Sequence, residues 1–170
     1  MPGTDDPAGE AAPISPADLL GAWQLVEYGE LRADGTLGEG PLGPRPRGVL
    51  IYEPHGHMSV SMMRGDAASG AVGVRTDPAV PSTGFMGYAA TWRVAGRRIL
   101  HHVQVSTHAY QLDQELIREA RLEEGRLTLG GTVVLAGRPR HRVLVWRRSA
   151  PRTHDLTPPD AARRRPGSGS

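Results

Sequence analysis

Three residues that could do chemistry, Tyr88, His101 and Arg118, each stand in a segment where apolar residues recur at every second position. Alternate side chains of a β-strand point to the same side, so each of the three would share a face with apolar neighbours and lie inside the fold. An enclosed arginine cannot become neutral and needs an anion, a carbonyl oxygen or another partner. Arg118 could therefore hold an acidic head group such as a carboxylate, an enolate or a tetramic acid.

The other two residues suggest proton chemistry. Histidine ordinarily titrates near neutral pH, so His101 could move a proton. Tyr88 could donate a hydrogen bond to an oxyanion that develops on a bound molecule. Together with Arg118 these are the candidate catalytic residues. Alternatively, the three satisfy one another, with Glu27 or Glu115, as a buried polar network that touches no ligand.

Apolar and aromatic side chains would shape the rest of a cavity. Methionine suits either a ligand pocket or an irregular core, because its side chain is flexible. Alternation along residues 57–64 puts Met58, Val60 and Met62 on one face. The residues that we expect to contact a substrate are Tyr52, Met58, Met62, Trp92 and Trp146.

Other kinds of site lack support. Among the seven histidines, His55 and His57 flank a turn, while His101 and His102 point to opposite sides of a strand. No further residue at metal-ligand spacing completes a set of three, so we expect no metal. The sequence also lacks a nucleophile elbow, a phosphate-binding loop and a dinucleotide fingerprint. We therefore expect no cofactor and neither nucleophilic hydrolysis nor nicotinamide chemistry.

Composition bears on partners and location. The basic residues are 20 arginines, balanced by 18 acidic residues to a formal net charge of +2. A nucleic-acid binder would cluster its charge and interleave aromatic residues, but the dense basic run at residues 163–165 is isolated and phenylalanine occurs once. We expect no nucleic-acid partner, while a homo-oligomer is compatible with the sequence.

The chain contains no cysteine, which leaves neither a disulfide nor a thiol site. Its N-terminal segment lacks the basic-then-apolar pattern of a secretory signal. No apolar run reaches the roughly 20 residues of a membrane helix. These features predict a cytoplasmic protein with no membrane partner.

The elements that would position the candidate residues are strands. After residue 19, apolar residues alternate with others and turn residues recur at short intervals, which predicts an antiparallel meander. Residues 111–120 could instead form a helix, but a turn at Gly125 and the strand after it favour a strand for the second half. A short helical turn is expected over residues 15–20. About eight strands are predicted, at residues 22–31, 48–53, 57–64, 87–95, 98–106, 115–122, 126–134 and 140–148.

The ends, residues 1–18 and 150–170, contain little that could be buried and are expected to be disordered. One domain, residues 19–149, remains. Within it, the segment 65–83 is too long for an ordinary hairpin loop and has a length typical of lids or mobile loops. Eight strands joined in sequence order suit a closed up-and-down barrel, although a sandwich would have the same strand count.

Several segments, in this order, resemble the bacterial lipocalin-like domain family. LLGAWQLVEY resembles the opening strand, with Gly21 and Trp23 in a relative of the lipocalin Gly-x-Trp element. PLGPRPRGVLIYEPHGHMSVSMMR resembles the next block, and GYAATWRV, RILHHVQVS, ELIREARLEEGRLTL and LVWRR match the strands that follow. The resemblance covers roughly residues 19–148. It implies an all-β fold, a single closed antiparallel up-and-down barrel with a pocket for a small, largely apolar molecule.

Two further points come from the resemblance. Family members often carry Pro and Trp near the positions of Ala109 and Gln111, a difference that alters the barrel mouth and so bears on the substrate. In lipocalin barrels a tryptophan on the first strand packs against an arginine near the end of the last. Trp23 is therefore expected to stack on Arg147 or Arg148, the alternative being an ordinary core residue.

Some small bacterial barrels of this type resemble polyketide cyclases, including catalysts of (4+2) ring closure. The resemblance thus implies a natural-product, polyketide-type cyclase or isomerase without a cofactor, since a shaped cavity and one or two donors suffice. Its partner would be a small hydrophobic ligand with an acidic or carbonyl head group. The alternatives are a non-catalytic carrier of a hydrophobic metabolite and a domain whose polar interior is purely structural.

Overall fold

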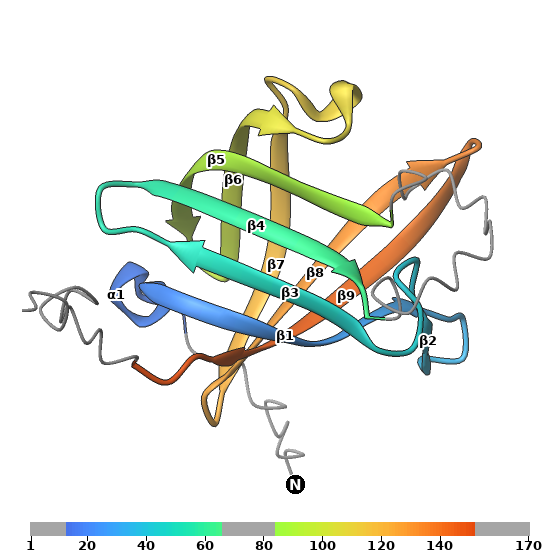
Figure 1. Ribbon diagram of the computed structural model, residues 1–170, viewed down its shortest axis with the longest axis horizontal. Helices are drawn as coiled ribbons and strands as arrows, with labels where there is room; N and C mark the ends of the chain where they lie inside the picture. Colours follow the sequence, from blue (N-terminus) through green and yellow to red (C-terminus); the bar gives the residue numbers. More distant parts are fainter. Residues whose placement is uncertain (1–12, 66–83, 152–170) are drawn as a thin grey trace, which may run out of the picture.

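The computed structural model describes residues 13–65 and 84–151. Within them, nine strands form one antiparallel sheet, and eight of these close into a barrel (Figure 1). A short helix, α1 (Pro16–Leu19), precedes the barrel, and a 3-10 segment, η2 (Ala109–Gln111), lies between β6 and β7. Neither described helical segment is long and apolar enough to cross a membrane. The strands are β1 (Gly21–Leu31), β2 (Leu37–Glu39), β3 (Pro46–Tyr52), β4 (His57–Arg64), β5 (Phe85–Ala95), β6 (Arg98–Ser106), β7 (Glu115–Glu123), β8 (Arg126–Leu135) and β9 (Arg138–Arg148).

The barrel closes because β1 pairs with β3 on one side and with β9 on the other. Trp23, for example, lies opposite Leu50 of β3 and opposite Arg148 of β9. The remaining neighbours follow sequence order from β3 to β9. This confirms the predicted all-β, up-and-down barrel and excludes the sandwich, since the strands form one continuous closed sheet.

Several local predictions can now be compared with the structure. β2 was not predicted; it is a short extra strand that pairs only with the end of β1. The segment 111–120 becomes a strand from Glu115 onward, as favoured, and α1 confirms the short helical turn. The predicted mobile segment 65–83 lies almost wholly outside the described residues, as does most of the two ends expected to be disordered.

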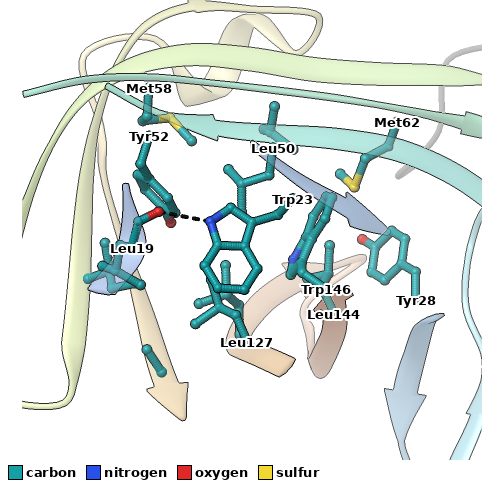
Figure 2. Close-up of a cluster of buried hydrophobic side chains, with 14 of the residues drawn as sticks. Leu19, Trp23, Tyr28, Leu50, Tyr52, Met58, Met62, Leu127, Leu144 and Trp146 are labelled. Atoms are coloured by element: carbon teal, nitrogen blue, oxygen red, sulfur yellow. Dashed lines mark hydrogen bonds between the residues drawn. The ribbon is translucent and has the colours of Figure 1, made fainter. Parts of the chain in front are cut away.

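One end of the barrel is closed by an apolar core around Trp23, which is completely buried (Figure 2). The indole Nε1 of Trp23 donates a hydrogen bond of 2.8 Å to the carbonyl of Leu19 in α1. The guanidinium of Arg148 lies 4.2 Å from the centre of the Trp23 ring and donates to the carbonyl of Leu20 at 2.7 Å. Arg148, and not Arg147, is therefore the cation that stacks on the first-strand tryptophan.

β1 contains a bulge between Leu25 and Glu27. The extra residue, Val26, has no partner in β9, so the inward and outward faces exchange at this point. Val26 and Glu27 are both exposed, whereas Tyr28 is buried. Glu30 follows Tyr28 on the same face and is partly enclosed. The bulge thus decides which acidic residue of β1 reaches the interior.

β7 and β8 pair along only part of their length. From their shared turn, the pairing recorded in the described chain extends only as far as Glu119 and Gly130. Beyond that point β7 continues along β6 and β8 continues along β9 to Leu135. Figure 1 shows the two strands diverging from their common turn. Beyond this point the backbone pairing recorded for the described residues does not join β7 to β8.

Candidate functional site

An interior cavity of about 60 Å³ extends from His101 to the η2 segment. Its wall includes the three candidate catalytic residues, Tyr88, His101 and Arg118, and two predicted substrate-binding residues, Met62 and Trp146. This volume exceeds the roughly 10–15 Å³ that a single water molecule needs. The cavity therefore accepts a small chemical group in its present shape, and a whole drug-sized ligand needs more room.

The other three predicted substrate-binding residues do not line the cavity. Tyr52 and Met58 are buried in the core. Trp92 packs on Tyr52 with ring centres 4.8 Å apart, and its Nε1 donates to the carbonyl of Glu53 at 3.1 Å. Alternation identifies correctly that all three point inward, but it does not say at which height along the barrel each one lies.

His101 is held between two tyrosine hydroxyls. It projects inward from β6 with 1% of its surface exposed. Its Nε2 lies 2.9 Å from the Tyr52 hydroxyl and its Nδ1 lies 2.8 Å from the Tyr88 hydroxyl. Burial, followed by the positive charge of Arg118, lowers the pKa of His101 to about 3. The imidazole is therefore neutral at physiological pH and offers one N–H donor and one bare nitrogen.

The two tautomers of His101 use the hydroxyls differently. When Nε2 carries the proton it donates to Tyr52, and Tyr88 donates to Nδ1. When Nδ1 carries the proton it donates to Tyr88, and Tyr52 donates to Nε2. Burial raises the pKa of Tyr52 well above its usual value, so Tyr52 keeps its proton in either role. In the second arrangement the hydrogen of the Tyr88 hydroxyl is available to an oxygen atom in the cavity.

Arg118 projects inward from β7 and donates a hydrogen bond to Tyr88. Burial acts to lower the pKa of Arg118, but the hydroxyls of Tyr88, Tyr28 and Tyr52 outweigh it and the pKa is raised, so the side chain stays charged. Among the described residues, the groups that act on this charge include no carboxylate. Because a guanidinium has five N–H donors, donors remain for an anion or a carbonyl oxygen.

The place of the Arg118 guanidinium depends on a glycine in the next strand. A Cβ atom built on Gly131 of β8 would overlap Nη1 of Arg118. Only a residue without a side chain lets the guanidinium lie this close to the β8 backbone.

A second inward arginine, Arg142 of β9, was missed by the sequence analysis. It is 6% exposed and lines the cavity, and its Nη1 lies 3.1 Å from the carboxylate of Glu30. Arg140 contacts the other oxygen of Glu30 at 2.6 Å. Alternation along β9 puts Arg142 on the same face as Trp146, so the signal was present in the sequence.

The acidic residue of the interior is Glu30, and not Glu27 or Glu115 as considered from the sequence. Both of these are exposed, and Glu115 pairs with Arg93 on the outer surface at 3.0 Å. Glu27 would face inward in a regular β1, but the bulge before it turns it to solvent. The bulge leaves no clear mark in the sequence.

The rim of the cavity includes η2. Tyr110 and Gln111 line the cavity, and the hydroxyl of Ser106 donates to Gln111 Oε1 at 2.7 Å. This is the segment in which the sequence differs from the Pro and Trp common in the family it resembles. Of these two positions, Gln111 lies in the wall of the cavity.

The closed eight-stranded barrel and its partly polar interior cavity define a lipocalin-like barrel, a class that suggests small-molecule binding. The family model described as a lipocalin-like domain matches residues 20–149, and the chain belongs to this family. Among solved structures, the siderocalin Ex-FABP is similar at 11% sequence identity and a TM-score of 0.39. That match covers 78% of this chain and 71% of the siderocalin chain. A search of curated proteins found no match.

Proposed function

We propose that the protein binds a small molecule with an anionic or carbonyl head group and a mostly apolar body. The observation that carries this proposal is the charge of the cavity wall, which contains Arg118 and Arg142 and no carboxylate of the described chain. Arg142 has Glu30 beside it, whereas tyrosine hydroxyls surround Arg118. A carboxylate, enolate or carbonyl oxygen would complete the hydrogen bonds of Arg118 and Tyr88.

The remainder of the wall suits an apolar body. It includes Val60, Leu129 and Leu144, and burial of apolar surface contributes about 25 cal/mol for each Å². Met62 and Met86 also line the cavity, and their flexible side chains can move to enlarge it. The small volume of the cavity therefore restricts the size of the head group, while the flexible methionines can make room for the body.

Binding of 2-naphthoate, a rigid aromatic carboxylate, tests the proposal when compared with methyl 2-naphthoate, its neutral ester. We expect tighter binding of the acid, and loss of that preference in Arg118→Met. A hydrogen bond to a charged group contributes about 1.5–3 kcal/mol, which is roughly 10- to 100-fold in Kd. Arg121→Met is the matched control, because Arg121 lies on β7 but pairs with Glu123 on the outer surface. Equal affinity for acid and ester, or unchanged acid affinity in a folded Arg118→Met, would contradict the proposal.

A second candidate is a cofactor-independent cyclase or isomerase of a polyketide-type natural product. It is favoured by the row of Tyr52, His101 and Tyr88, in which a neutral imidazole can leave the Tyr88 hydroxyl free to donate. That hydroxyl would polarise a carbonyl group of a bound intermediate, and the apolar wall would hold the intermediate in a reactive conformation.

Native mass spectrometry after incubation with an extract of the source cells separates the candidates. A retained molecule that leaves as a new isomer supports the cyclase or isomerase. One that leaves unchanged supports a carrier. A folded barrel that retains nothing favours a purely structural interior.

A further inference from the structure

Between β7 and β8 lies a groove of about 600 Å³. Its lining contains inward-facing side chains, such as Leu116 and Val133, and outward-facing ones, such as Ile117 and Val134. The groove thus lies where the pairing of β7 with β8 has ended, and its lining includes residues of both faces of the barrel wall.

The groove meets the interior cavity at Arg118. Four residues line both spaces, namely Arg118, Val133, Tyr110 and Gln111, and Arg118 is the charged one among them. The guanidinium lies over Gly131, whose missing Cβ leaves room for it between the two strands. A single cation, Arg118, thus lines both the interior cavity and the groove.

We propose that the ligand binds across the barrel wall, with its anionic head group at Arg118 and Tyr88 and its apolar body in the groove between β7 and β8. This inference rests on the proposed function and adds where the body lies and how the molecule reaches the site. Without movement of Met62 and Met86, the interior cavity of about 60 Å³ accepts the head group alone, so the body then lies in the groove. The groove of about 600 Å³ lies within the usual range for ligand sites and accepts a body of fused rings or a short chain.

The charges along the groove are compatible with an anion. Its two acidic residues are each paired with an arginine, Glu119 with Arg98 at 2.7 Å and Glu115 with Arg93 at 3.0 Å. The charge of Arg118 at the inner end therefore dominates the path of an approaching carboxylate. An amphiphilic organic acid, apolar apart from one carboxylate or enolate, matches this arrangement.

Single thiols test the position of the ligand, because the natural chain has no cysteine. Ile117→Cys places a thiol on the β7 side of the groove, and Ile51→Cys places one on the outer face of β3. Ile117 is 49% exposed and Ile51 is 44% exposed, so the two variants are matched. The rate of modification by N-ethylmaleimide is measured with and without 2-naphthoate.

We expect 2-naphthoate at ten times its Kd to slow modification of Ile117→Cys about 10-fold, because roughly one molecule in eleven is then unoccupied. Modification of Ile51→Cys should be unchanged. A second pair guards against a variant that fails to fold: Val134→Cys on the β8 side, 70% exposed, and Val105→Cys on β6, 65% exposed.

Each outcome has a distinct meaning. Protection of the groove thiols alone supports binding across the wall. Measurable binding of 2-naphthoate without protection, or with equal protection of the control thiols, overturns this inference and leaves the proposed function standing. Absence of 2-naphthoate binding to the unmodified protein overturns both.

Discussion

Arg118 and Gly131 meet across the gap between β7 and β8, and the guanidinium fills the space in which a side chain at position 131 would begin. The relationship is steric. It positions a positive charge on which no carboxylate of residues 13–65 or 84–151 acts, and it can be altered without removing that charge.

The Gly131→Ala substitution should therefore weaken binding of 2-naphthoate while leaving Arg118 in the chain. The new methyl group displaces the guanidinium from its place, and we expect a loss of roughly 10-fold in affinity, equal to about 1.4 kcal/mol. Titration calorimetry measures the affinity. Gly130→Ala is the control for an added methyl group on the same strand, because a Cβ there faces outward, with its nearest neighbours in His141 at 3.2 Å and Glu119 at 3.9 Å and none in Arg118. Similar affinities of the two variants would contradict the steric relationship.

The two tyrosines beside His101 should respond differently to loss of their hydroxyls. Tyr88→Phe removes a donor that lines the cavity, so it should weaken binding of both 2-naphthoate and its ester by about 0.5–1.5 kcal/mol. Tyr52→Phe removes a hydroxyl that does not reach the cavity. It should leave affinity unchanged but lower the free energy of unfolding by about 1–3 kcal/mol, since a buried nitrogen of His101 loses its partner. Affinity and urea unfolding are measured for both variants, and a reversed pattern would refute the assignment.

The buried neutral His101 predicts a pH dependence of stability. The pKa of an unfolded histidine is about 6.5 and the folded value is about 3, so between these values the unfolded state binds more protons. The stabilisation is fully present above about pH 6.5 and falls as the pH is lowered, with a slope approaching about 1.4 kcal/mol per pH unit.

Urea unfolding between about pH 4 and pH 7.5 measures that slope. His101→Gln is the reference, because the difference between the two proteins removes the contribution of the carboxylates. Parallel curves would mean that His101 takes up its proton at the same pH in the fold as in the unfolded chain, and would contradict its lowered pKa.

Arg148→Met should destabilise the barrel by about 1–2 kcal/mol, because it removes the stacking on Trp23 and hydrogen bonds to the carbonyls of Leu20 and Asp18. Arg147→Met provides the comparison. Its side chain is exposed and makes one long bond, 3.4 Å, to Gln24, so we expect less than about 0.5 kcal/mol. Thermal unfolding of the two variants checks the difference, and equal losses would assign no special role to Arg148.

Much of the barrel could be predicted from the sequence, because alternation depends on the backbone alone. Tyr88, His101 and Arg118 line the interior cavity, as alternation along their strands predicts. The pairing of Trp23 with an arginine of the last strand is confirmed as well.

Alternation does not predict how far along the barrel axis each side chain lies, nor where the pairing between strands becomes irregular. The height of each residue follows from strand register, which is why Trp92 packs against Tyr52 in place of lining the cavity. Because of the bulge in β1, Glu30 faces the interior and Glu27 faces solvent. The pairing of β7 with β8 ends early, at Glu119 and Gly130. Both are tertiary effects that local residue patterns do not record.

The pairing of β1 with β9 has a consequence for how the protein is made. Arg148 donates a hydrogen bond to the carbonyl of Leu20, which lies 128 residues earlier in the sequence. Proteins dominated by such distant contacts fold slowly. During synthesis all strand pairs except β1–β9 and β8–β9 can form before β9 emerges, so that one edge of β1 and one edge of β8 stay unpaired. Until β9 emerges and joins them, the nascent chain is an open sheet with two free edges, the form most prone to pair with another copy. The last strand is thus also the protection of the newly made chain against aggregation.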